Sequence, residues 1–453
     1  MRARLQRLTG WGNFRATDCH VYRPERSRDI AQILAASAQK DFISRGLGRS
    51  YGDSALNSNG VLWHARLNRM LAFDPKSGAL DCEAGVSLHD ILRVFLFKGF
   101  FLPVTPGTKH VTLGGAIAAD VHGKNHHKDG SFGAFVDEIR LMNAAQEIVV
   151  CSREQNADLF QATIGGMGLT GVILSARIRL RPVETAYMDV HYQKAESLDR
   201  ALELFSADDA RFDYSVAWVD CLAGGKSLGR SVLMRGHHAP RSALSGWRQE
   251  HPFDVRGKRG SSVPFNMPGF VLSPFAVRTF NALYYAMHSN TKRLVGYEEF
   301  FYPLDSIANW NRLYGKRGFV QYQVLFPSAS SRQGLVEILE ALSRSGRASF
   351  LAVLKSSGAA GEGLLSYLFA GHTLALDIAT FPGLAELLKS LDKIVLKHGG
   401  RLYLAKDACM DKGTFAAMYP NTARFKEVKA RVDPGQKFAS EQARRVGLVE
   451  AHG

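Results

Sequence analysis

Two glycine-rich stretches near the N-terminus decide the fold: residues 45–53 read RGLGRSYGD, and residues 105–127 read TPGTKHVTLGGAIAADVHGKNHH. A third stretch, residues 164–171, reads IGGMGLTG. Glycine lets the backbone curve tightly and approach a ligand, and successive backbone N–H groups in such turns bind phosphate. One such turn is commonplace, but three within the first 171 residues indicate a dinucleotide cradle.

The spacing of these glycines argues against a Rossmann fold. That fold needs G-x-G-x-x-G directly after a strand and at the start of a helix. Gly46, Gly48 and Gly52 are spaced differently, and the DSALNSNG that comes after them does not form a helix. In the second stretch, Gly114 and Gly115 begin a helix of small residues that can lie close against a ligand.

Length and composition predict a globular chain with two or three domains, because 453 residues exceed one ordinary core. The sequence contains no stretch of about 18 apolar residues, so we expect no transmembrane helix. The N-terminus is basic and has no apolar signal-peptide region. The five cysteines are far apart and form no CxxC pair, which argues against structural zinc and a disulfide framework. We therefore expect a cytoplasmic protein.

The net charge of +15 attracts nucleic acid, anionic membranes and phosphorylated substrates alike. The basic residues are spread along the chain and accompany no nucleic-acid motif, so we expect no nucleic-acid partner. General surface charge is the simplest alternative explanation.

The pattern of apolar residues predicts an α+β fold with two domains. Residues 1–185 contain the glycine stretches, and residues 400–453 are expected to pack back onto them. In residues 186–399, strand-like and helix-like runs alternate, which predicts an antiparallel sheet covered by helices. A basic stretch at about residues 235–260 has no clear period, and we expect a long loop there that is either functional or disordered.

The glycine stretches resemble the two-part FAD-binding domain of the vanillyl-alcohol-oxidase type, also called PCMH-type. In many members of that family a histidine of a G-x-G-H-S motif bonds covalently to the flavin, whereas this chain has Arg49 at that position. The resemblance therefore implies non-covalent FAD. The residues it assigns to the cofactor are Arg45, Gly46, Leu47, Gly48, Arg49, Ser50, Tyr51, Gly52, Pro106, Gly107, Thr108, Gly114, Gly115, Ala118, Ala119, His122, Gly123, Gly168, Leu169, Ile173, Tyr403 and Lys406.

Further motifs resemble the subfamily of these oxidases that acts on decaprenylphosphoryl-ribose. They are GKSLGRSVLMRG, EEFFYPLD, QYQ, GGRLYLAKD and VDPGQKFAS-x-x-ARR, in that order along the chain. The resemblance implies oxidation of the ribose 2-hydroxyl to a 2-keto sugar. It also implies a companion NADH-dependent reductase that completes epimerisation to the arabinose donor for cell-wall glycans.

Three residues are catalytic candidates: Lys406, Tyr51 and His122. Alcohol oxidation by a flavin needs positive charge beside the flavin and a group that takes the hydroxyl proton. Lys406, which we expect at the end of an apolar strand, is the first choice for the charge. Lys406 and Tyr51 are both candidates for the base, and bulk water stays open as an alternative.

The candidates for substrate binding are Lys124, Gln321, Gln323, Lys355 and Lys406. Strand alternation places Gln321 and Gln323 on one face and Tyr322 on the other, so both amides can reach sugar hydroxyls. Solvent-facing amides are the alternative. His126 and His127 are adjacent, but no carboxylate or thiol completes a ligand set, so we expect no metal.

A polyprenyl-phosphate substrate is drawn from a bilayer, so we expect peripheral association with an anionic inner-membrane surface, with the basic stretch after Arg235 as a mobile lid. Two alternatives are open. One is a soluble aldonolactone or alditol oxidase on the same scaffold. The other is a non-enzymatic basic protein that binds membranes or nucleic acid.

Overall fold

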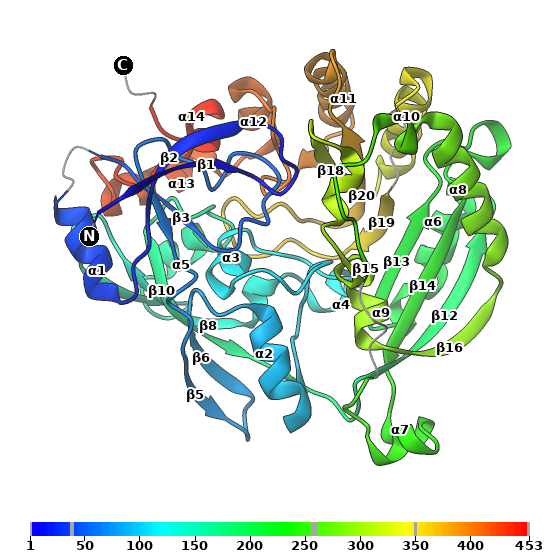
Figure 1. The fold of residues 1–453 in the computed structure, drawn as a ribbon, viewed down its shortest axis with the longest axis horizontal. Helices are drawn as coiled ribbons and strands as arrows, with labels where there is room; N and C mark the ends of the chain where they lie inside the picture. Colours follow the sequence, from blue (N-terminus) through cyan, green and yellow to red (C-terminus); the bar gives the residue numbers. More distant parts are fainter. Residues whose placement is uncertain (1, 37–39, 256–260, 348–350, 451–453) are drawn as a thin grey trace.

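The computed structural model describes residues 2–36, 40–255, 261–347 and 351–450. Two sheets form the N-terminal part (Figure 1). The first is mixed and has the order β1 (Arg4–Thr9), β2 (Ala16–Tyr22), β4 (Val61–Trp63) and β3 (Ile43–Arg45). The second is antiparallel, with the order β5 (Met70–Asp74), β6 (Ala79–Glu83), β10 (Val172–Arg179), β8 (Val136–Met142) and β9 (Ile148–Ser152).

An eight-stranded antiparallel sheet dominates the rest of the molecule (Figure 1). Its order is β16 (Thr291–Gly296), β12 (Tyr187–Ala195), β14 (Ser231–His238), β13 (Tyr214–Val219), β19 (Ala352–Ser357), β20 (Gly371–Ala379), β18 (Phe319–Pro327) and β21 (Arg401–Leu402). The short pairs β7 (Phe100–Phe101) with β11 (Arg181–Pro182) and β15 (Ser261–Ser262) with β17 (Ile307–Ala308) complete the strands. The α+β class is confirmed.

Alternation along β18 gives the large sheet two different faces. Gln321 and Gln323 point toward the N-terminal part, where Gln323 contacts His122. Tyr322 points the other way, and its hydroxyl donates to Asp392 at 2.7 Å. The expected alternation is confirmed, so one face is free for the site and the other is covered by helices.

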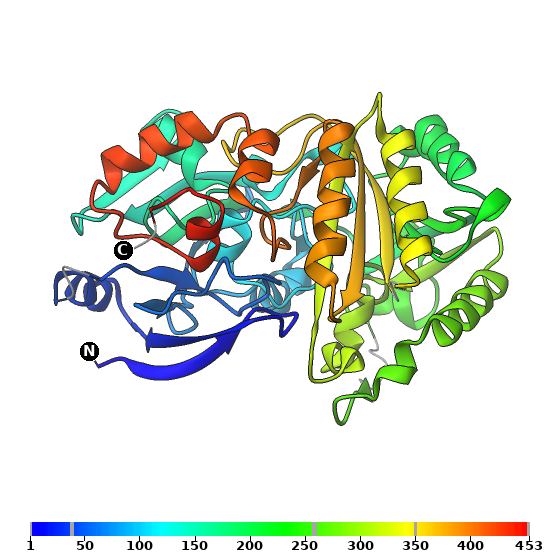
Figure 2. The same cartoon turned by 90° about the horizontal axis from the view of Figure 1, so that it is seen from above.

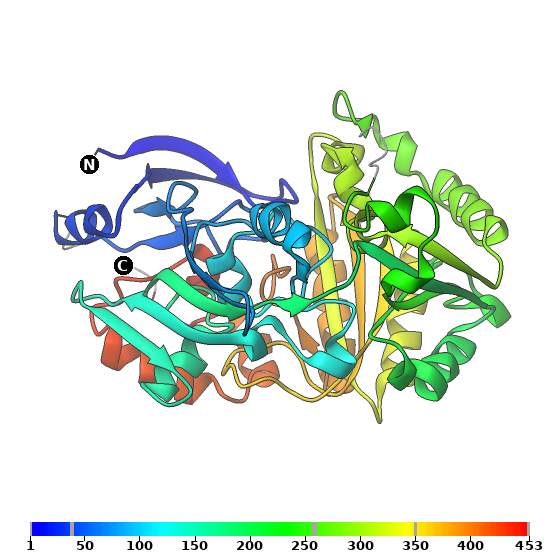
Figure 3. The ribbon, with the colours of Figure 1, turned by 90° about the horizontal axis from the view of Figure 1, so that it is seen from below.

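Three helices lie on the covered side: α6 (Leu198–Asp208), α10 (Ser331–Ser345) and α11 (Leu384–Lys397). In Figure 2, α10 and α11 run side by side over the strands. Helix α8 (Pro274–Met287) lies at the outer edge of the molecule (Figure 3). The other helices are α1 (Ser27–Ala36), α2 (Leu88–Phe95), α3 (Leu113–Ala118), α4 (His126–Asp129), α5 (Ala157–Thr163), α7 (Trp247–Glu250), α9 (Tyr297–Phe301), α12 (Lys412–Met418), α13 (Thr422–Val432) and α14 (Glu441–Arg445).

Eight short 3-10 turns connect these elements in the described part of the chain. They are η1 (Leu96–Lys98), η2 (Phe132–Phe135), η3 (Asp209–Arg211), η4 (Gly225–Ser227), η5 (Arg241–Ala243), η6 (Gly269–Leu272), η7 (Pro303–Ser306) and η8 (Trp310–Tyr314). One continuous core of buried apolar side chains runs through the N-terminal sheets and the large sheet. The two parts are therefore packed on each other rather than joined by a linker.

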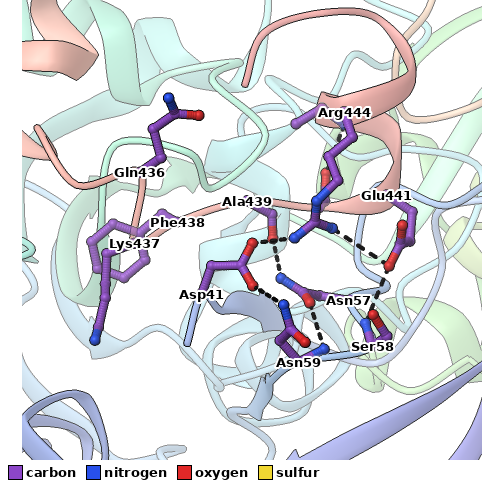
Figure 4. A network of polar contacts seen from close by, with 12 residues as sticks. Asp41, Asn57, Ser58, Asn59, Gln436, Lys437, Phe438, Ala439, Glu441 and Arg444 are labelled. Atoms are coloured by element: carbon purple, nitrogen blue, oxygen red, sulfur yellow. Dashed lines mark hydrogen bonds and ion pairs between the residues drawn. The ribbon is translucent and has the colours of Figure 1, made fainter. Parts of the chain in front are cut away.

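The C-terminal tail returns to the N-terminal part, as the sequence predicts. Figure 4 shows the contact: Arg444 pairs with the buried Asp41, and Glu441 accepts a hydrogen bond from the backbone of Ser58. Asn57 donates to the carbonyl oxygen of Ala439 at 2.7 Å. The division of the chain into domains at residues 185 and 400 stays a prediction, and β21 adds a short strand of this tail to the large sheet.

The predicted basic loop at 235–260 is wrong at its start. Residues 235–238 belong to β14, and the short elements η5 and α7 come only after that strand; residues 256–260 lie outside the described residues. Arg235 is 2% exposed and donates to Leu204 and Gln193, so it does not face solvent. The continuous apolar run Val232–Met234 extends the strand to Arg235, but the basic residues that follow led the sequence pattern to predict a loop there.

In the described part of the chain, no helix is long and apolar enough to cross a bilayer.

Candidate active site

The first two glycine stretches lie against each other. A side chain at Gly46 would place its Cβ 2.2 Å from the hydroxyl of Thr112, the residue that caps α3. Gly48 has a φ of +66°, and the guanidinium of Arg45 fills the space beside it while donating to the carbonyl oxygen of Thr9. Glycine is thus required at 46 for contact and at 48 for conformation.

This loop offers free donors. In the part of the chain that the structure describes, the backbone N–H groups of residues 46–50 donate no hydrogen bond to protein, and these residues are only partly exposed. Partly buried N–H groups without partners are costly unless a ligand accepts from them. A pyrophosphate supplies such acceptors, so the loop fits the dinucleotide that the sequence predicts.

The third glycine stretch packs on the C-terminal end of α3. The N–H of Met167 donates to the carbonyl oxygen of Ala118 at 2.8 Å, and the N–H of Gly165 donates to that of Ile117 at 3.0 Å. The hydroxyl of Tyr403 donates to Ala119 at 2.8 Å. Two further cofactor candidates are buried here, Leu169 within this stretch and Ile173 just after it. Small residues along α3 allow all these approaches.

Further cofactor candidates lie in the second stretch. A Cβ at Gly107 would meet nothing within 4 Å, so the backbone is open there. Gly123 is closely packed between Thr105 and Asn125. Arg49, in the first stretch, lies over the ring of Trp11, with 4.1 Å between the guanidinium carbon and the ring centroid.

Lys406 and Tyr51 meet, as the candidate site requires. The Lys406 ammonium nitrogen lies 4.0 Å from the centroid of the Tyr51 ring and donates no hydrogen bond to a described residue. Burial lowers the pKa of Lys406 to about 7; Asp377 opposes this shift and Lys355 adds to it. The expected strand position is wrong, because β21 ends at Leu402 and Lys406 lies in the turn after it. The cause is the backbone N–H of Lys406, which bonds back to Tyr403.

His122 is held by Gln323, with 2.8 Å between the two Nε2 atoms. Its Nδ1 is buried and has no partner among the described residues. Burial lowers the pKa of His122 well below its ordinary value, and the positive charges of Lys355 and Lys406 add to the shift. The imidazole is therefore neutral near pH 7, with one ring nitrogen available to a ligand.

Three lysines converge on this region from distant parts of the chain. Lys355 Nζ donates to the carbonyl oxygen of Gly123 at 3.4 Å, and Lys124 lies over the ring of Phe300. Burial lowers the pKa of Lys355 to about 8. Burial and the charge of Lys355 together lower the pKa of Lys124 to about 7. Such a concentration of positive charge, with few carboxylates, suits an anionic ligand.

The adjacent histidines have structural partners. His126 Nδ1 accepts from the backbone N–H of Gly358 at 3.0 Å and lies 2.9 Å from the hydroxyl of Ser357. His127 Nε2 contacts the carbonyl oxygen of Phe212. Within the described ranges, no three His, Cys, Asp or Glu side chains gather as metal ligands.

The sequence reasoning missed Asp377, which is fully buried in β20. Gln321 donates to its Oδ1 at 2.6 Å, and the Tyr314 hydroxyl lies 3.3 Å from its Oδ2. Burial raises the pKa of Asp377 to about 7, while Gln321 and Lys406 act against the shift. An acidic residue in the apolar run TLALDIATF was the signal that could have found it.

Arg445 ties the first glycine stretch to the Lys406 turn. Its guanidinium donates to Asp53 at 2.6 Å and to Asp407 at 2.9 Å. A Cβ at Gly52 would lie 2.0 Å from the carbonyl oxygen of Asp407, so the two stretches touch. Arg445 of helix α14 thus holds the first glycine stretch beside the turn that contains Lys406.

Comparison with known proteins agrees with this geometry. Residues 20–152 match a family model described as an FAD binding domain, and residues 365–446 match one described as D-arabinono-1,4-lactone oxidase. The first match contains two glycine stretches, and the second contains Tyr403, Lys406 and Arg445. The cofactor predicted from the sequence is therefore confirmed as FAD.

The chain is similar to a decaprenylphosphoryl-β-D-ribose oxidase of Mycolicibacterium smegmatis, with 37% identity over 98% of each chain. It is also similar to a mouse L-gulonolactone oxidase, with 23% identity over 94% of each chain. A Mycobacterium tuberculosis L-gulono-1,4-lactone dehydrogenase is 21% identical over 94% of this chain and 95% of its own. These relatives are oxidoreductases, so the non-enzymatic alternative is set aside. The chain belongs to the FAD-dependent sugar oxidase family that includes decaprenylphosphoryl-β-D-ribose oxidase.

Proposed function

We propose that this enzyme oxidises the 2-hydroxyl of a polyprenylphosphoryl-β-D-ribose to the 2-keto sugar. The observation that carries the proposal is the convergence of Lys124, Lys355 and Lys406 beside two inward-facing glutamines. A sugar phosphate needs this combination, since its phosphate is anionic and its hydroxyls require amide partners. The similarity to an enzyme named for decaprenylphosphoryl-ribose supports the same substrate.

Lys124 and Lys355 are proposed to bind the phosphate. Their lowered pKa values mean that each ammonium is costly in the protein alone, and a phosphate offsets that cost. Gln321 and Gln323 are proposed to hydrogen-bond the ribose hydroxyls. Both amides are fixed on β18 by Asp377 and His122, so they are oriented before the sugar arrives.

Bound FAD supplies the acceptor for the hydride of the alcohol carbon. Lys406 is proposed to place its ammonium beside the flavin, where it stabilises the negative charge that reduction creates. Tyr51 keeps its proton at neutral pH, because burial raises its pKa well above the ordinary value. We therefore assign Tyr51 a positioning contact with the ring and sugar rather than the role of base.

His122 is proposed to orient the substrate hydroxyl, whose proton passes to water. The amide N–H of Gln323 donates to His122 Nε2, so the neutral ring carries its proton on Nδ1, which lacks a described partner and can donate to a ligand oxygen. Gln323 holds the other nitrogen and so fixes the ring orientation. Gln323→Leu should leave the flavin content intact and slow flavin reduction about tenfold.

The decisive experiment is anaerobic mixing of the FAD-loaded enzyme with a polyprenylphosphoryl-ribose or with an L-gulono-lactone, followed by flavin absorbance. We expect bleaching with the lipid-linked ribose. Bleaching by the lactone alone would overturn the proposal.

The second candidate is an aldonolactone oxidase. It is favoured by the match of residues 365–446 to the D-arabinono-1,4-lactone oxidase model, which contains Lys406. The three lysines favour the phosphate substrate, because a lactone carries no charge for Lys124 and Lys355 to neutralise.

The FAD is proposed to be non-covalent, with Arg49 in place of a tethering histidine. Acid precipitation should release all flavin into the supernatant. We further propose that the enzyme works peripherally at the inner membrane with a separate NADH-dependent keto-reductase, which returns the 2-keto sugar as the arabinose epimer. Mixing both proteins with NADH should yield the epimer.

A further inference from the structure

Helix α8 and the turn η6 before it carry a concentrated apolar surface. In the described part of the chain, eleven large apolar side chains are exposed, and six of them lie between residues 265 and 287. These six are Phe265, Phe270, Phe275, Phe280, Leu283 and Met287. Scattered exposed apolar residues are normal, but a concentration of this kind marks an interaction surface.

The orientation of α8 is fixed from its inner side. Asn281 is buried and donates to Asp220 at 2.7 Å, and the Tyr284 ring packs on Trp218 with 4.5 Å between centroids. Phe275 and Met287 face solvent, 80% and 71% exposed. The apolar surface is therefore presented by a docked helix and is not a frayed end.

The charge of this region has one sign. Residues 261–297 contain no aspartate or glutamate, whereas Arg278, Lys292 and Arg293 are basic. Lys316 and Arg317, just beyond η8, are exposed beside η6. An apolar surface bordered by cations complements the headgroups and acyl chains of an anionic bilayer.

A groove of about 570 Å³ opens beside η6. Leu272, Leu313 and Phe381 contribute apolar walls, and Lys316 and Arg317 contribute positive charge. Tyr314 lines the groove, and its hydroxyl contacts Asp377, which Gln321 also contacts in the candidate site. Tyr314 therefore lies between the groove and the Asp377 side of the candidate site.

We propose that η6 and α8 dock into an anionic lipid bilayer and that the groove beside them admits the lipid chain of the substrate. The proposal rests on the proposed function, because a lipid-linked sugar has to be drawn from a bilayer. It moves the membrane contact from the stretch that begins at the buried Arg235 to a surface about 40 residues further along the chain.

A second copy of the chain is the competing occupant. Two such surfaces meeting face to face would bring Arg278, Lys316 and Arg317 of both copies into one interface. Residues 261–297 supply no carboxylate there to neutralise these charges. Like charges in contact oppose association, so the bilayer is favoured.

The test is flotation of the FAD-loaded full chain with vesicles of phosphatidylglycerol and phosphatidylcholine in equal amounts. We expect the protein to float with these vesicles and to stay behind with phosphatidylcholine alone. The triple variant Phe270→Ser, Phe275→Ser, Met287→Ser should bind at least about tenfold more weakly, because it loses exposed apolar surface without disturbing the inner face of α8.

The matched control is Leu5→Ser, Leu71→Ser, Phe97→Ser, which removes comparably exposed apolar residues elsewhere and should float like the parent protein. In the pair Lys316→Glu, Arg317→Glu, vesicle binding should weaken roughly fivefold or more for each charge, and the loss should shrink at high salt.

Equal flotation of both triple variants would overturn the proposal, as would gel filtration showing a dimer that only the α8 variant breaks. Flavin bleaching by a short-chain prenylphosphoryl-ribose in solution needs no membrane, so it tests the proposed substrate independently of the docking surface. Both triple variants should bleach at the parent rate. A protein that floats through α8 yet is not bleached would refute the substrate and leave the docking surface standing.

Discussion

Lys406 is half-buried and Lys429 is buried, and their surroundings differ. Lys429, in α13, is 4% exposed and donates to Asp433 at 2.6 Å and to the carbonyl oxygens of Leu169 and Phe438. All three ammonium protons are used. Lys406 has the ring of Tyr51 beneath it and no described hydrogen-bond acceptor. The comparison separates a lysine whose donors are all used within the protein from one whose donors stay available for a ligand.

The largest expected effect is on catalysis at Lys406. Lys406→Met should slow anaerobic flavin reduction roughly a thousandfold, about 4 kcal/mol, because the charge that stabilises reduced flavin is lost. The melting temperature of the variant should not fall, since no hydrogen bond to the protein is removed. A lower melting temperature with an unchanged rate of flavin reduction would contradict this prediction. Lys406 would then be a structural lysine like Lys429.

The next effect is on stability at Lys429. Lys429→Met should lower the free energy of unfolding by about 3–5 kcal/mol, because the buried carboxylate of Asp433 loses its partner. Urea titration measures this, and Lys426→Met on the exposed side of α13 serves as the control. Flavin reduction by the molecules that stay folded should match the parent enzyme.

The pH profile sharpens the comparison further. Lys406 has a pKa of about 7, so its ammonium is present below that pH and is lost above it. If the ammonium is the active form, the rate of flavin reduction should fall up to about tenfold per pH unit above the pKa. A rate that rises above pH 7 would instead make Lys406 the base. In Lys406→Arg the fall should disappear, because arginine keeps its proton.

The smallest expected effect comes from Asp377→Asn. The negative charge of Asp377 raises the pKa of Lys406, so its removal should shift the fall in rate to lower pH by less than about one unit. Asp392→Asn is the matched control, because Asp392 is also buried but contacts Tyr322 on the other face of the sheet. If both variants shifted the pH at which the rate falls by the same amount, the effect of Asp377 would be a nonspecific effect of net charge rather than of its contact with the site.

Much of this could be predicted from the sequence. Glycine spacing and the motif order were enough to predict the FAD cradle, because phosphate binding depends on backbone that only glycine permits at positions such as 46 and 48. Strand alternation also placed Gln321 and Gln323 correctly. These are local properties, which short stretches of sequence encode.

The misses share a different physical cause. Asp377 is part of the site only because β20 pairs with β18, a contact that no local pattern reports. Arg235 looked like surface charge, yet a carbonyl oxygen of α6 and an amide of β12 bind it inside the molecule. The apolar side of α8 was overlooked because its exposure depends on which face the rest of the fold covers.

Arg445 has a consequence for how the protein is made. It pairs with Asp53, which lies 392 positions before it, and with Asp407. During synthesis the first glycine stretch emerges early, but the contact that holds it against the Lys406 turn cannot form until Arg445 has left the ribosome. FAD loading should therefore wait for the emergence of Arg445, and a nascent chain stalled before Arg445 should be colourless.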